Sequence, residues 1–138
     1  MNRIVISSAL TMLLAACAKD EGPLHVPKPV IPGEPVDTAY FNSEVLPILA
    51  ARCWTCHPPM GGMDLSEGEA YMSLVGVEST NHAPAVRVVP GDPHVSVLYQ
   101  KLEGDPATGA RMPFGGEALP PAQRLLIHDW IEQGAHNN

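Results

Sequence analysis

The segment "RCWTCHPPM", residues 52–60, places Cys53, Cys56 and His57 within five positions. Two thiols separated by two residues and followed directly by an imidazole constrain this chain more than any other feature does. Such a cluster is typical of a redox dithiol, of half a zinc site, or of the covalent attachment point of a haem. Each of these sites needs different partners elsewhere in the chain, so the surrounding sequence can distinguish them.

The dithiol and zinc interpretations lack those partners. A thioredoxin-like C-x-x-C belongs to a βαβ arrangement, and no strand pattern precedes Cys53. A structural zinc site needs four ligands, usually with a second Cys or His pair at similar spacing. A plain disulfide stays open in an oxidising compartment, but it would not explain His57. The remaining histidines are isolated along the chain; they are His25, His82, His94, His128 and His136.

The haem interpretation accounts for all three residues. C-x-x-C-H is the signature of c-type haem attachment. Two cysteines three positions apart can each form a thioether with a vinyl group on one edge of a porphyrin, and the next residue then lies beside the iron. We therefore expect one covalent haem c, bound through Cys53 and Cys56, with His57 as the proximal iron ligand.

The first 16 residues have the pattern of a signal peptide. A positive start at Arg3 precedes a mostly apolar stretch over 4–14 and then small residues, as signal peptidases require. About a dozen apolar residues are too few for a transmembrane helix. Leu-Ala-Ala-Cys at 14–17 resembles a bacterial lipobox, the alternative being an ordinary signal peptide cut nearby. We expect a lipoprotein with lipid on Cys17, anchored in the bacterial cell envelope and facing the periplasm or another extracytoplasmic space.

Residues 17–36 are expected to form a tether, and residues 37–138 a single domain with a modest core. Five prolines fall between 23 and 35 without an amphipathic period, and proline favours an extended chain because it fixes φ and lacks a backbone donor. Without residues 1–16 the chain keeps 7 basic and 15 acidic residues, a net charge of −8. This acidity excludes nucleic acid as a partner and favours a redox protein with a basic docking surface.

Apolar residues recur at helical spacing from Asp37 onward, and no segment alternates as a strand would. We expect an all-α domain of about four helices and long loops, which a large cofactor would give a surface to pack against. Ser43 is expected to cap the first helix, Ser66 and Glu69 to form a capping box for the second, and Gly134 to end the last. The expected helices cover 44–57, about 67–75, a segment after Asp92-Pro93, and 122–133 after Pro120-Pro121. The residues expected on buried faces are Val45, Ile48, Leu49, Cys53, Val97, Leu98, Leu102, Leu126, Ile127, Trp130 and Ile131.

Chain reach limits which residue can bind the iron opposite His57. The connecting chain must round the porphyrin edge, a path of about 20 Å, whereas the three residues to Met60 span at most about 10 Å. Met60 is therefore excluded and Met63 is marginal. The residues with sufficient reach are Met72, His82, His94 and Met112.

Met112 is favoured by its setting, "GARMPFGG". It lies in a loop before the last helix, Pro113 stiffens the backbone beside it, and the glycines at 115–116 let the chain turn closely around a flat ligand. Met72, on a short helix, has the pattern of core filler. The two histidines stay open as ligands of a bis-histidine haem.

With "CWTCH" at the first helix, "RMP" in a late loop and "WIEQGA" at the close, the chain resembles a class I c-type cytochrome. The pattern "F…EVLPILAARC…CH…GGMDLS…VVPGDPHVSVLY…RMP…WIEQGA", over about residues 40–135, is similar to the planctomycete-type cytochrome c domain. The resemblance implies a class I cytochrome c-like fold around one haem, with Cys53 and Cys56 as thioether residues, His57 as proximal ligand and Met112 as distal ligand.

The resemblance also implies that the first and last helices cross beside the haem, near Trp130. Class I cytochromes often carry a glycine and an aromatic residue on the first helix at this crossing. This chain has Val45 and Leu49 instead. The contact between the two helices is therefore expected to differ from the usual one.

These expectations converge on a membrane-tethered electron carrier, not an enzyme, with no small-molecule substrate. Histidine–methionine ligation fills both axial positions, and the thioether of Met112 favours ferrous iron. Arg87 and Arg111 are expected either to pair with haem propionates or to be solvated surface charges. The alternatives are a haem-based gas or redox sensor, an accessory haem subunit of a larger oxidoreductase complex, and a peroxidase-type enzyme, which usually needs a second haem or a distal base.

Overall fold

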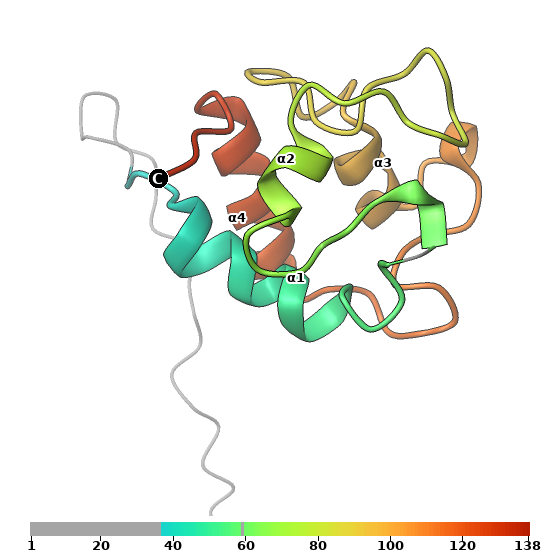
Figure 1. The fold of residues 1–138 in the computed structure, drawn as a ribbon, viewed down its shortest axis with the longest axis horizontal. Helices are drawn as coiled ribbons and strands as arrows, with labels where there is room; N and C mark the ends of the chain where they lie inside the picture. The colour runs from blue at the N-terminus through green and yellow to red at the C-terminus, as the bar shows by residue number, and fades with distance from the viewer. Residues whose placement is uncertain (1–36, 59) are drawn as a thin grey trace, which may run out of the picture. The chain divides into compact units, whose positions relative to one another are not determined.

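The computed structural model describes residues 37–58 and 60–138, so the predicted signal peptide, Cys17 and the tether lie outside the described residues. The described part contains four α-helices, short π- and 3-10-helical turns and no strand, only isolated bridges. The expectation of an all-α chain of about four helices is confirmed. The elements are η1 (Phe41–Val45), α1 (Leu46–Arg52), η2 (Met60–Gly62), α2 (Ala70–Leu74), α3 (Val97–Glu103), η3 (Pro106–Thr108) and α4 (Pro121–Glu132) (Figure 1).

The first helical segment begins before Ser43. The π-helical turn η1 runs directly into α1, so Ser43 is an internal residue and the prediction that it caps this helix is wrong. The start is held instead by the Glu44 carboxylate, which accepts a hydrogen bond of 2.8 Å from the backbone N–H of Tyr40. Pro47 is the second residue of α1, directly after the π-helical turn.

The second helix is shorter than predicted and has no capping box. The backbone carbonyl of Ser66, and not its hydroxyl, accepts the N–H groups of Glu69 and Ala70 at 3.1 and 3.0 Å. The Asp64 carboxylate accepts the N–H of Ser66 at 2.8 Å, and hydrogen bonds from Ser66 lower the pKa of that carboxyl. This tight turn delays the start of α2 to Ala70.

The third helix begins after a turn closed by an aspartate. The Asp92 carboxylate accepts the N–H groups of His94 and Val95 at 3.1 and 3.3 Å, so Asp92 stabilises the turn that precedes α3. Gly104 ends α3 at a φ of +77°, and Gly134 follows α4 at a φ of +104°. Both values lie in the left-handed region that glycine adopts at low cost, as predicted for Gly134.

The apolar faces predicted for the first and last helices form the centre of the core. The loops contribute fully buried residues as well, Leu65 and Leu119 among them. Each such side chain stabilises the fold by about 1.5–3 kcal/mol relative to exposure. The predicted residues that are buried are Val45, Ile48, Leu49, Val97, Leu102, Ile127, Trp130 and Ile131, whereas Cys53, Leu98 and Leu126 are partly buried.

The first helical segment meets α4 through Phe41. Its ring lies 5.1 Å from that of Trp130, at 34°, and 5.3 Å from that of Tyr71, edge to face. The Trp130 indole donates a 2.9 Å hydrogen bond to the His136 carbonyl. Val45 and Leu49 stand where an aromatic residue is usual, and Phe41, one turn earlier in η1, makes the aromatic contact with α4 instead.

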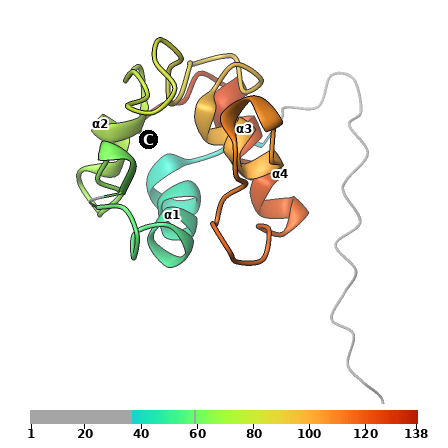
Figure 2. The same ribbon diagram turned by 90° about the vertical axis from the view of Figure 1, so that its right-hand side faces the viewer.

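The helices form two pairs, with α1 and α2 on one side and α3 and α4 on the other (Figure 2). The segment 104–120, which joins α3 to α4, passes beside the C-terminal end of α1 in both views. Among the described residues, no helix combines the length and apolar character that crossing a membrane requires.

Candidate functional site

The three residues of the C-x-x-C-H motif lie in one tight turn directly after α1. The N–H of Cys53 donates to the Leu49 carbonyl at 2.9 Å, and the N–H of His57 donates to the carbonyls of Cys53 and Trp54 at 3.1 Å each. Cys53 is half-buried, Cys56 is exposed, and both thiols are free. The turn therefore presents two unpaired sulfur atoms and one imidazole from adjacent positions.

The ring of His57 is buried and oriented by the loop that follows it. Its Nδ1 is hydrogen-bonded to the backbone carbonyl of Met60. Because a carbonyl only accepts, Nδ1 carries the proton and Nε2 keeps a free lone pair, the arrangement found for metal-binding histidines. Gly61 lies against the ring at a φ of +72°, where an added Cβ would be 3.2 Å from His57 Cε1. The sequence excluded Met60 as a ligand but did not reveal the role of its carbonyl.

The thiol of Cys53 is protonated at neutral pH. Burial raises its pKa to about 11; the cation of Arg52 acts in the opposite direction, and Cys56 adds to the rise. Reactive dithiols of the thioredoxin type have an attacking cysteine with a lowered pKa. The environment of Cys53 therefore disfavours the redox-dithiol interpretation on grounds independent of the strand pattern.

Met112 is held in place by α3. Its backbone N–H donates a 2.9 Å hydrogen bond to the Lys101 carbonyl, and its partly buried side chain packs against the core. Arg111, the residue before Met112, packs against Gly104 at the end of α3. A Cβ added to Gly104 would be 3.3 Å from the Cβ of Arg111. The loop that carries Met112 is therefore anchored close to the body of the domain.

A hollow of about 360 Å³ separates the end of α1 from the Met112 loop. Ala51 and Arg52, just before Cys53, line one side, and Pro113, Gly116 and Glu117, just after Met112, line the other. Segments about 60 residues apart in sequence thus face one another. Cys53, Cys56, His57 and Met112 do not themselves line the hollow, which is bordered by residues adjacent in sequence to Cys53 and to Met112.

The other residues considered as distal ligands are placed less favourably. A Cβ added to Gly61 would lie 3.5 Å from the Met63 methyl and 3.2 Å from the His57 ring. Met63 therefore lies on the same side of the site as His57. The ring of His94 packs against the ring of His128, at 5.8 Å, away from the hollow. His82 is partly exposed in a loop. Met72 is 71% exposed, so the prediction that it fills the core is wrong.

Arg87 is not the solvated surface charge that the sequence left open as one of its two roles. It is buried, and its guanidinium donates to the carbonyls of Ser73 at 2.7 Å and Gly62 at 2.9 Å and to the Thr80 hydroxyl at 3.0 Å. It therefore joins the loop after His57 to the end of α2. Arg111 is exposed, and its side-chain hydrogen bond within the described residues is a long one of 3.4 Å, to the carbonyl of Gly116.

Arg87→Met is expected to lower the free energy of unfolding by about 3 kcal/mol, because it removes a charged donor and leaves buried carbonyls without a partner. Arg111→Met is the matched control and should change stability by less than about 0.5 kcal/mol. Urea unfolding followed by circular dichroism measures both. Equal effects of the two variants would contradict a structural role specific to Arg87.

A second hollow, of about 250 Å³, is likewise lined by none of the four predicted haem-binding residues. It is lined by Thr38, Ala39, Trp130, Gln133, His136 and Asn138.

Comparison of the chain with protein-family models, curated proteins and solved structures found no match. The assignment of the site therefore rests on the residues and their geometry.

Proposed function

We propose that the chain is a single-haem c-type cytochrome with a class I-like fold that carries electrons between redox partners. The observation that carries the proposal is the orientation of His57: its Nδ1–H is bonded to the Met60 carbonyl, and its Nε2 is free beside two unpaired thiols. The Met112 loop across the hollow supports the same proposal.

Each residue of the site has a distinct role in this proposal. Cys53 and Cys56 would hold the haem covalently: each S–H would add across one vinyl group, with the sulfur on one carbon and the hydrogen on the other, so no oxidant would be needed. His57 donates its Nε2 lone pair, and the Met60 carbonyl increases the basicity of the ring. Met112 would bind the iron through its thioether sulfur, a ligand that favours the reduced state. When bound, the haem would supply one iron that alternates between ferrous and ferric.

The proposal also covers location and partners. Lipid on Cys17 would hold the domain at a membrane of the bacterial cell envelope, with residues 17–36 as the tether. The excess of acidic residues would favour a redox partner with a basic docking surface. No side chain of the site is assigned a catalytic role, since His57 and Met112 would both bind the iron.

Optical spectroscopy of the purified protein tests the proposal. A pyridine haemochrome assay should give one haem c per chain, and a redox titration should show one reversible one-electron step. The reduced protein should bind carbon monoxide weakly, because Met112 occupies the sixth position. Strong carbon monoxide binding would favour a gas sensor, and a preparation without haem from cells able to mature c-type cytochromes would refute the proposal.

A further inference from the structure

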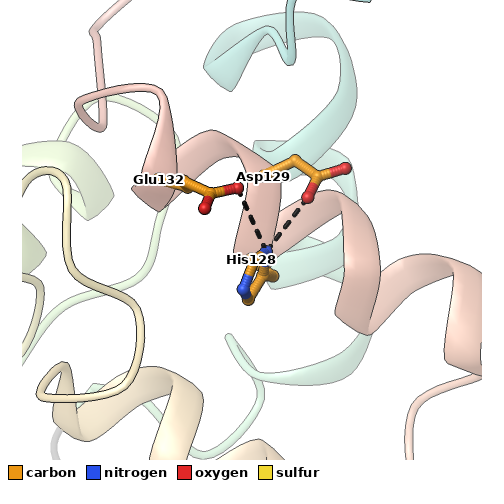
Figure 3. A group of neighbouring side chains, drawn as sticks. All are labelled: His128, Asp129 and Glu132. Carbon is orange, nitrogen blue, oxygen red and sulfur yellow. Dashed lines mark hydrogen bonds and ion pairs between the residues drawn. The ribbon is translucent and has the colours of Figure 1, made fainter. Parts of the chain in front are cut away.

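A cluster of metal-binding side chains lies on α4, outside the site described above. Nδ1 of His128 is 3.0 Å from Oδ1 of Asp129 and 3.9 Å from Oε2 of Glu132, and Figure 3 shows both carboxylates turned toward this nitrogen. One ligand atom from each residue lies within 4.8 Å of the others. The three residues come from adjacent turns of a single helix, so their spacing is set by the helix itself.

A second imidazole lies beside this cluster. His94, in the turn before α3, has its ring centroid 5.8 Å from that of His128, and both rings contact the ring of Tyr99, at 6.0 and 5.2 Å. The side chain of His94 is exposed, so it can rotate about its χ angles. A second histidine, from a different element, is thereby brought next to His128, and rotation of its side chain would turn its ring nitrogens toward the cluster.

Two carboxylates lie at the end of α4 where the helix dipole favours a cation. Asp129 and Glu132 lie in the last turn of the helix, where the macrodipole is negative and basic residues are preferred, and the last turn contains no basic residue. Within residues 37–58 and 60–138, no Lys or Arg forms a salt bridge with either carboxylate. His128 is their one ionic partner there, and it is positively charged only when protonated.

We propose that His128, Asp129, Glu132 and His94 form a binding site for a divalent transition-metal ion with the preferences of Zn²⁺. Zinc takes four nitrogen or oxygen ligands at about 2.0–2.2 Å, so its ligand atoms lie roughly 3–3.5 Å apart. The His128–Asp129 separation of 3.0 Å already has this value, and the exposed Glu132 side chain must rotate toward the other two ligand atoms, which now lie within 4.8 Å of its own. Binding through Nδ1 of the neutral His128 ring requires the ring proton to lie on Nε2, so the metal takes the place of a proton on Nδ1 beside the Asp129 carboxylate.

Isothermal titration calorimetry of the full-length protein with zinc sulfate tests the site. We expect one strong site per chain, weakened about tenfold or more in His128→Gln and in His94→Gln, because each loses an imidazole ligand. His136→Gln is the matched control: it removes an exposed histidine just beyond α4 and should leave the affinity unchanged. X-ray absorption at the zinc edge should show two imidazoles and no sulfur in the coordination shell.

The calorimetric and absorption results distinguish a four-ligand zinc site from a histidine that only forms ion pairs. No zinc binding by the unmodified protein would show that His128 only forms ion pairs with its neighbours, and would overturn the proposal. Unchanged affinity in either His128→Gln or His94→Gln would overturn the four-ligand site, as would a coordination shell that contains sulfur. Circular dichroism of each variant confirms that a lost affinity is not caused by unfolding.

Discussion

The double variant Cys53→Ser, Cys56→Ser is expected to contain no covalently attached haem, compared with one haem per chain in the unmodified protein. Serine hydroxyls do not form thioethers with vinyl groups, so both covalent links are lost. Both thiols are free in the turn after α1, where Cys53 is half-buried and Cys56 is exposed. Intact-protein mass spectrometry measures the result directly, after expression in cells that mature c-type cytochromes.

Cys17→Ser is the matched control, since it removes the third cysteine and leaves the C-x-x-C-H motif intact. We expect this variant to keep its haem and to move from the membrane fraction to the soluble periplasmic fraction. Loss of haem in Cys17→Ser, or full haem content in the double variant, would contradict the assignment of the cysteines.

Met112→Ala is expected to change the iron site without unfolding the domain. The sulfur-to-iron charge-transfer absorption should disappear, and the reduced protein should bind carbon monoxide. The midpoint potential should fall, because the thioether favours the ferrous state. Axial ligands set haem potentials over a range of about 0.8 V, so we expect a decrease on the order of 0.2 V. Absorption spectroscopy and a redox titration measure these effects.

Two methionine variants are controls for Met112→Ala. Met72 is 71% exposed, so Met72→Ala should leave the spectrum intact and change stability by less than about 0.5 kcal/mol. Met63 lies on the His57 side of the site, so Met63→Ala should keep the charge-transfer absorption. If Met112→Ala leaves the spectrum unchanged while His82→Ala or His94→Ala alters it, the haem has two histidine ligands and the assignment of Met112 is wrong.

Helix boundaries were harder to predict than helix positions. The capping roles given to Ser43 and to Ser66 with Glu69 rested on side-chain spacing alone. In the structure, η1 extends the first helix past Ser43 toward the N-terminus, and the Asp64–Ser66 turn competes for the residues before α2. Local hydrogen bonds of this kind have energies similar to those of a cap, so spacing alone does not decide between them.

The sequence by itself determined the all-α class, the buried faces of the first and last helices and the motif that binds the proposed cofactor. These depend on helical periodicity and on residues adjacent in the chain, so a single segment contains the information. Only the tertiary structure decided which distant groups meet: the Met60 carbonyl at His57, Phe41 against Trp130, and Arg87 under the loop after His57. Such contacts depend on how the loops fold back over the core, and no periodic pattern in the sequence records those paths. The cluster of His94 and His128 has the same origin, since it joins residues that are isolated along the chain but adjacent where α3 packs against α4.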